Sequence, residues 1–223
     1  MLRRALRFVG WTLATWIVLS VGTVLALRWS DPPTSAFMIR ERLSAPIRHG
    51  WVDEANISAH IKVAVIAAED QNFPAHYGFD LKSINDALED RQRGRRVRGA
   101  STLSQQVAKN LFLWPQQSWL RKGLEAYFTV LIETLWPKQR ILEVYLNVAE
   151  FGRGVFGVGA ASDVYFRKRA ARLNQDDAAL LAAVLPSPKR MRVNSPTNYV
   201  RSRQQWILEQ MRGLGGTALL EEM

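Results

Sequence analysis

An acidic pair opens the segment 69–80, which reads EDQNFPAHYGFD. Glu69 lies eight positions after Ile61 and therefore extends the apolar stripe of a predicted helix. A carboxylate at the edge of a buried face is partly desolvated, which raises its pKa and suits it to act as a general base near neutral pH. The spacing is equally compatible with Glu69 capping or pairing locally at a helix end. His76 is interpreted as a packed, hydrogen-bonded histidine rather than a catalytic one.

A second polar segment, 99–110, reads GASTLSQQVAKN. Thr102 followed three residues later by Gln105 is a capping-box pattern, which predicts a helix start. Lys109 lies two turns into that helix, and the small residues Gly99, Ala100 and Ser101 precede the helix start. A helix N-terminus of this kind suits a phosphate group. An ordinary amphipathic helix with a solvated polar face is the alternative.

A third cluster consists of Arg121, Lys122 and Glu125. On a helix, residues three and four apart are neighbours, so both cations can approach the carboxylate. On an open surface this would be an ion pair worth about a few tenths of a kcal/mol. In a cleft, the cations would neutralise a leaving diphosphate, and Glu125 would orient them or a metal ion. A fourth segment, 138–147, has an apolar face and is interpreted as the scaffold of the cleft.

The elements that must position these residues are predicted to be helices. By residue number, they run from Ser58 to 68, from near 102, over 119–135, over 137–147, after 174 and after 198. The predicted core face of the helix over 119–135 comprises Leu124, Phe128, Leu131 and Leu135. Glycines at 152, 154, 157 and 159 predict a turn region, and no stretch is rich in strand signals. The fold is therefore expected to be mainly α.

The N-terminus is predicted to be a membrane anchor. Residues 8–27 carry no charge and match the length of about 20 residues that a helix needs to cross the hydrocarbon core. Arg3, Arg4 and Arg7 precede this run and favour a cytoplasmic N-terminus. A cleaved signal peptide is the alternative, although the run exceeds its usual core of about 7–15 residues and no A-x-A site follows. The predicted division is 1–7 cytoplasmic, 8–28 transmembrane, 29–51 linker and 52–223 the main domain.

The composition limits the classes of partner and site. The chain has 223 residues, a net charge of +10 and no cysteine, so disulfides and thiolate metal sites are excluded. A basic balance favours nucleic acid, anionic headgroups or phosphorylated substrates. The segment 91–98 contains five arginines, which could form a solvated loop or contact anionic lipid or a substrate phosphate. It lacks the interleaved aromatic residues typical of single-strand binding, so no nucleic-acid partner is expected.

Together and in this order, the four segments resemble glycosyltransferase family 51, the peptidoglycan glycosyltransferases. The patterns are E-D-x-x-F-x-x-H-x-G-F-D from Glu69, G-x-S-T-L-x-Q-Q-x-x-K-N from Gly99, R-K-x-x-E from Arg121 and K-x-x-I-L-E-x-Y-L-N from Lys138. The resemblance covers about residues 52–206. It implies a lysozyme-like fold: a mostly helical head lobe and a smaller, membrane-touching jaw lobe. The absence of S-x-x-K and K-T-G signatures predicts the form without a transpeptidase domain.

The resemblance also implies a reaction. The substrate would be lipid II, a disaccharide-pentapeptide on undecaprenyl diphosphate. Glu69 would be the general base that takes the proton from the 4-hydroxyl of the acceptor GlcNAc. That oxygen would attack C1 of the donor MurNAc with inversion, and undecaprenyl diphosphate would leave. Glu125 would be the second essential carboxylate. The residues implied to line the substrate sites are Ser101, Thr102, Gln105, Gln106, Lys109, Asn110, Arg121 and Lys122, of which Lys109, Arg121 and Lys122 match the diphosphate-binding cations.

The expected partners are lipid II, the growing glycan strand, membrane lipid, and proteins of cell-wall synthesis or division. The expected location is the bacterial inner membrane, with the catalytic domain on the periplasmic side. No cofactor is certain; family members often respond to Mg²⁺ or Mn²⁺, but no ligand cluster here has metal-site spacing. The apolar run 111–114 is expected either to dip into lipid or to join the core.

The main alternative function is a lysozyme-like lytic enzyme that acts on preformed peptidoglycan. Such enzymes also use carboxylates in a helical cleft, but they need no diphosphate site. A non-catalytic, membrane-anchored basic module is the second alternative.

Overall fold

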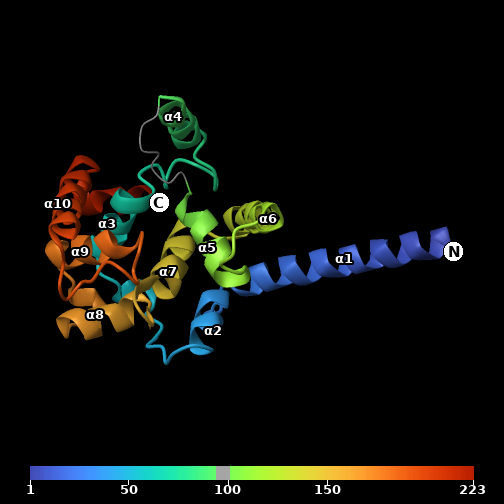
Figure 1. Cartoon of the computed structure of the whole chain (residues 1–223), viewed down its shortest axis with the longest axis horizontal. Helices are drawn as coiled ribbons and strands as arrows, with labels where there is room; N and C mark the ends of the chain where they lie inside the picture. The colour runs from blue at the N-terminus through green and yellow to red at the C-terminus, as the bar shows by residue number, and fades with distance from the viewer. Residues whose placement is uncertain (94–100) are drawn as a thin grey trace.

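The structure, a computed structural model, describes residues 1–93 and 101–223. Its helices and strands, shown in Figure 1, are α1 (Leu2–Ala26), α2 (Ala36–Arg42), η1 (Glu54–Asn56), α3 (Ala59–Glu69), α4 (Leu81–Gln92), α5 (Leu103–Phe112), α6 (Trp119–Leu135), α7 (Lys138–Val148), β1 (Glu150–Gly152), β2 (Val155–Phe156), α8 (Val158–Phe166), η2 (Ala170–Arg172), α9 (Gln175–Val184), α10 (Asn198–Gly213) and η3 (Gly216–Glu222). The prediction of a mainly α fold is confirmed.

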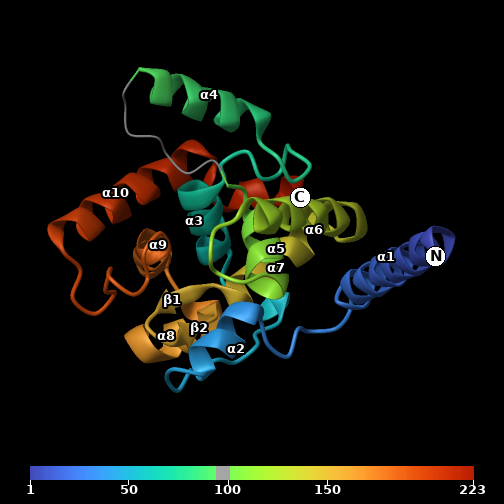
Figure 2. The ribbon, with the colours of Figure 1, turned by 45° about the vertical axis from the view of Figure 1, so that its right-hand side comes forward.

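Helix α1 projects from the folded body, as Figures 1 and 2 show. Residues Arg3–Ala26 are long and apolar enough to cross a membrane, and little of this stretch is buried in the molecule. The end of α1 that enters the body packs against α6. Within residues 1–93 and 101–223, α1 is the one helix compatible with a membrane anchor. The predicted division of the chain into 1–7, 8–28, 29–51 and 52–223 stays a prediction.

Helices α3, α9 and α10 pack on one another and form one part of the body. Ser58 caps α3, Asn174 opens α9 with a capping box, and Thr197 caps α10. Each side chain accepts a bond from a backbone N–H that the helix itself leaves unpaired. These starts agree with the predicted helices. Helix α3 is buried along most of its length, which fits its nearly continuous apolar sequence.

Helix α5 packs on both α6 and α7, which form the second part of the body. The predicted core face of α6 is confirmed only in part. The buried residues of this helix are Arg121, Glu125, Thr129 and Ile132, whereas the predicted core residues Leu124, Phe128, Leu131 and Leu135 are only half-buried. Phe128, Leu131 and Leu135 still pack against the hydrophobic core. The most deeply buried stripe of α6 is mostly polar, because it faces α5 and the site.

Three α-helices and a hairpin of the described residues were not predicted, and neither were the short helices η1, η2 and η3. Helix α2 lies in the predicted linker, where Ser35 caps it and Met38 enters the core. Helix α4 belongs to a mostly polar stretch, and α8 follows the glycine-rich turn. Strands β1 and β2 pair antiparallel around that turn. Gly157, at φ 82°, passes so close to the Asn147 carbonyl that a Cβ would meet it at 2.8 Å, which explains the glycine between β2 and α8.

Candidate active site

Glu69 is the last residue of α3, and its side chain is held by two other helices. The amide Nε2 of Gln106, on α5, donates to Oε2 at 3.0 Å. The guanidinium of Arg203, on α10, lies 3.5 Å from Oε1. Because both partners come from distant segments, the alternative of purely local pairing does not hold.

Burial raises the pKa of Glu69, whereas the hydrogen bond from Gln106 and the charges of Arg203 and Lys109 oppose that shift. The side chain is 14% exposed. The predicted desolvation of this carboxylate is therefore confirmed. A carboxylate with a raised pKa and some access to solvent is suited to accept a proton near neutral pH.

Asp70 ties the end of α3 to the start of α5. Its carboxylate lies 2.9 Å from Nε2 of His76 and also accepts a bond from the Leu103 N–H at 2.9 Å. Nδ1 of His76 accepts a bond from the Gly78 N–H at 3.1 Å, so Nε2 carries the proton toward Asp70. The interpretation of His76 as a packed, hydrogen-bonded histidine is confirmed.

Thr102 and Gln105 form the predicted capping box. The Thr102 hydroxyl accepts a bond from the Gln105 N–H at 3.2 Å and donates to the Gly78 carbonyl at 2.7 Å. The side-chain oxygen of Gln105 accepts from the Thr102 N–H at 3.0 Å. Both side chains are buried. Their visible role is to fix the start of α5, and a substrate contact by either residue stays a prediction.

Arg121, Lys122 and Glu125 meet on α6 as their spacing predicts. Arg121 Nη1 lies 2.5 Å from Glu125 Oε2, and Lys122 Nζ contacts the other carboxylate oxygen. Arg121 and Glu125 are both buried, whereas the Lys122 side chain is 47% exposed. Within residues 1–93 and 101–223, Arg121 Nε is buried without a hydrogen-bond partner. The ion pair between Arg121 and Glu125 is therefore buried, and Lys122 extends the cluster to the surface.

Lys109 interacts electrostatically with both carboxylates, Glu69 and Glu125. Burial lowers the pKa of Lys109, and the nearby charges of Arg121 and Lys122 lower it further, whereas Glu125 and Glu69 both raise it. One side chain thus lies within electrostatic range of Glu69 on one side and of the α6 cluster on the other. The structure brings the two predicted catalytic carboxylates and the three predicted cations to one region.

The remaining predicted positions lie at the edges of this region. Ser101 is exposed just before α5, and Asn110 is half-buried on α5. In the arginine-rich segment, Arg93 pairs with Glu89, and Arg95, Arg96 and Arg98 lie outside the described residues. In the apolar run 111–114, Leu111 and Leu113 are buried and Trp114 is exposed, so the first part joins the core.

The donors present do not fit a metal site. No group of three or more His, Asp or Glu side chains that could hold an ion occurs in the part of the chain that the structure describes. Both oxygens of Glu125 already face cations, Arg121 and Lys122. A divalent ion at Glu125 would have to displace them, so no step of the reaction is assigned to a metal here.

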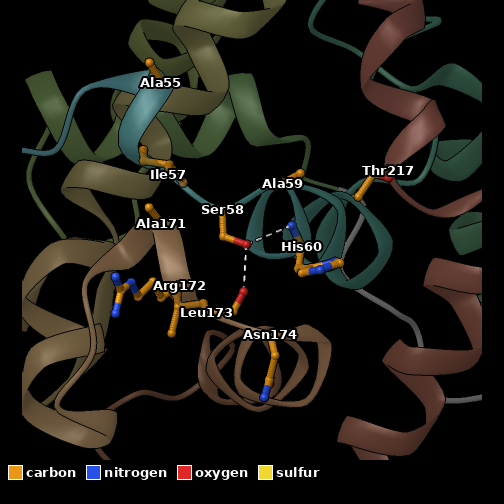
Figure 3. A pocket seen from close by; sticks show the side chains of 10 residues that line it. All are labelled: Ala55, Ile57, Ser58, Ala59, His60, Ala171, Arg172, Leu173, Asn174 and Thr217. Atoms are coloured by element: carbon orange, nitrogen blue, oxygen red, sulfur yellow. Dashed lines mark hydrogen bonds between the residues drawn. The ribbon is translucent and has the colours of Figure 1, made fainter.

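A cavity of about 580 Å³ lies elsewhere, at the opposite end of α3 (Figure 3). Its lining includes Ser58 and His60 at the start of α3 and Asn174 at the start of α9. Glu69 lies ten residues further along α3, about 15 Å away at the helical rise of 1.5 Å per residue. The chemistry described above therefore does not use this cavity.

Two residues of the site were not found from the sequence. Arg203 contacts Glu69, and the hydroxyl of Tyr145 lies 3.3 Å from the side-chain oxygen of Gln106. Tyr145 lies in the segment 138–147, which was interpreted as the scaffold of the cleft, and Arg203 lies outside all four motifs. No spacing rule connects either residue to Glu69, because each contact spans many residues of sequence.

The chain resembles known proteins over nearly its whole length. A family model described as "Transglycosylase" matches residues 38–212. A protein of Xanthomonas campestris pv. campestris (strain B100) named "Biosynthetic peptidoglycan transglycosylase" is 50% identical over 98% of this chain and 94% of its own. Proteins with the same name from Cronobacter sakazakii and Salmonella agona are 52% and 57% identical, over 99% and 84% of this chain and 93% and 81% of theirs.

Proposed function

The chain belongs to the transglycosylase family, and on this premise we propose that it polymerises peptidoglycan glycan strands from lipid II. It is a peptidoglycan glycosyltransferase, as the names of its relatives indicate. One observation carries the assignment of residues: Lys109 lies within electrostatic range of Glu69, Glu125, Arg121 and Lys122. A base and a set of cations therefore share one region, as glycosyl transfer from a diphosphate requires.

Glu69 is the proposed general base. Its deprotonated carboxylate accepts the proton of the 4-hydroxyl of the acceptor GlcNAc as that oxygen bonds to C1 of the donor MurNAc. The bond between C1 and the diphosphate oxygen breaks, and its electron pair leaves with undecaprenyl diphosphate. The hydrogen bond from Gln106 supports this role because it orients the carboxylate before the acceptor arrives.

Lys109, Arg121 and Lys122 are the proposed partners of the leaving diphosphate. Electrostatic groups already in place cost no reorganisation when charge develops. Glu125 holds Arg121 and Lys122 in position and limits the repulsion among the cations. Burial lowers the pKa of Lys109, and a diphosphate bound beside it would favour its charged form.

The proposed setting is the periplasmic face of the inner membrane, with α1 as the single-pass anchor. The arginines before α1 support a cytoplasmic N-terminus. Helix α6, which carries Arg121 and Glu125, exposes Trp119, Leu120 and Val130. A lipid-linked substrate stays in the bilayer, so a site on a helix with an exposed apolar side suits it. Cell-wall synthesis or division proteins are the proposed protein partners.

A polymerisation assay with purified lipid II tests the proposal. We expect Glu69→Gln to reduce strand synthesis by about 10²–10⁴-fold, the usual contribution of a general base. Glu209→Gln, which changes an exposed carboxylate on α10, is the matched control and is expected to retain wild-type activity. Unchanged synthesis by Glu69→Gln would remove the assigned base. Shortening of preformed peptidoglycan without any polymerisation would favour the lytic alternative instead.

A further inference from the structure

Arg203 reaches the catalytic region from a helix that none of the four motifs includes. It lies on α10, 134 positions after Glu69. Its Nη2 atom lies 3.5 Å from Glu69 Oε1 and 3.4 Å from the carbonyl oxygen of Ala68. The arginine thus contacts both the backbone and the side chain of the last turn of α3.

The guanidinium of Arg203 is held in a confined place. Its side chain is 21% exposed, and its carbon Cζ lies 5.9 Å from the ring centroid of Trp206. Its Nε is buried and has no hydrogen-bond partner within the described ranges. An arginine side chain packed near an aromatic ring is held in place by packing as well as by charge. The charge is therefore fixed beside Glu69 before any substrate binds.

The carboxylate of Glu69 has a different partner on each oxygen. Oε2 accepts from Gln106, whose own side-chain oxygen is contacted by the hydroxyl of the fully buried Tyr145. Oε1 faces Arg203. The titratable and charged groups that interact with Glu69 are Asp70 just after α3, Lys109 from α5, Tyr145 from α7 and Arg203 from α10.

We propose that Arg203 is a positioning residue for the reaction: it holds Glu69 through the oxygen that Gln106 leaves free and places a positive charge beside that carboxylate. This inference rests on the proposed role of Glu69 as general base. Gln106 supplies direction but no charge, and Lys109 also faces the cation cluster of α6. Arg203 differs from Lys109 because its described contacts are with Glu69 and the end of α3 rather than with the α6 cluster.

The direction of the effect follows from the charges. Burial raises the pKa of Glu69, and Arg203 opposes that rise. Without the guanidinium, the pKa of Glu69 rises further, so a smaller fraction of the enzyme carries a deprotonated base at acidic pH. The acid limb of the pH–rate profile should then move to higher pH. A purely structural arginine that only binds the Ala68 carbonyl would change stability without moving this limb.

The test uses the full-length protein in detergent or vesicles with lipid II as the probe. Initial polymerisation rates are measured from pH 5 to 9 for Arg203→Gln, Arg203→Lys and the control Arg201→Gln, an exposed arginine on the same helix. We expect Arg203→Gln to be at least about tenfold slower than wild type at the acid end but within about threefold on the alkaline plateau. Arg203→Lys should restore most of the acid-limb activity, and Arg201→Gln should match wild type.

Thermal melting of each variant separates the structural explanation from this one. An equal loss of rate at all pH values, together with a lower Tm and no rescue by lysine, would overturn the proposal, as would an unchanged profile. The variant Glu69→Gln separates the proposed role of Glu69 as general base from the proposed role of Arg203. If Glu69→Gln stays active, the proposed base is wrong; if it is inactive and Arg203→Gln behaves like wild type, only the role of Arg203 fails.

Discussion

The hydroxyl of Ser20, within the apolar helix α1, lies 2.7 Å from the phenolic oxygen of Tyr127 on α6. Trp16 packs on the same tyrosine with ring centroids 4.9 Å apart, and the indole N–H of Trp136 donates to the carbonyl of Val24 at 2.7 Å. Helix α6 also carries Arg121 and Glu125. Helix α1 is therefore docked directly on α6, the element that bears the cation cluster.

The docking of α1 predicts a specific cross-link. The chain has no cysteine, so Ser20→Cys with Tyr127→Cys gives a unique pair of thiols. A short bis-maleimide should join these thiols in membranes with high yield. If the chain is then cleaved by a protease between α1 and α6, the cross-linked fragments should stay together and migrate as one band on a gel. The control pair is Thr12→Cys with Tyr127→Cys, because Thr12 lies two turns nearer the N-terminus, about 12 Å along α1. Equal yields for the two pairs would show that α1 is a loose tether.

Removal of Glu125 should destabilise the protein. Glu125→Gln leaves the buried Arg121 without its counter-charge, and breaking a buried pair in this way costs about 3 kcal/mol. Glu89→Gln is the matched control, since Glu89 and Arg93 also form an i,i+4 pair but are both 60% exposed. We expect that control to cost about 0.5 kcal/mol. Equal unfolding free energies for the two variants in denaturant titrations would contradict the interior position of the α6 cluster.

Thr102 is expected to act through the start of α5. Thr102→Ala loses the cap on the Gln105 N–H and the bond to the Gly78 carbonyl, and should lower the unfolding free energy by about 1–2 kcal/mol. Thr102→Ser keeps the hydroxyl and should recover most of that loss. Full stability of Thr102→Ala combined with a raised KM for lipid II would instead assign this hydroxyl to the substrate.

The pH dependence of stability should reveal the cost of the Glu69 carboxylate. Its folded-state pKa is raised by burial, so the folded state loses stability as pH rises from the unfolded pKa through the raised folded value. Glu69→Gln carries no such charge. The difference in Tm between Glu69→Gln and wild type, measured from pH 4 to 8, should therefore grow in favour of the variant as pH increases. A difference that is constant or shrinks with pH would contradict the raised pKa.

Local features of the site were predictable from the sequence alone. The approach of Arg121 and Lys122 to Glu125, and the capping box of Thr102 and Gln105, involve residues three or four apart. Helical geometry brings such residues together whatever surrounds the helix. For the same reason, the start of α3 at Ser58 and the extent of α6 agreed with the prediction.

Tertiary packing decided the rest. The apolar residues of α6 predicted a face that packs against the core in part, but not that its polar stripe would be buried more deeply. The spacing of residues shows where the polar side of a helix lies but not what that side faces. Arg203 and Glu69 are 134 positions apart, and Ser20 and Tyr127 are 107 apart. No local rule relates residues at such separations. Only the packing of α10 on α3 and of α1 on α6 brings these side chains into contact, and this packing determines the surroundings of Glu69 and the position of α1 on the body.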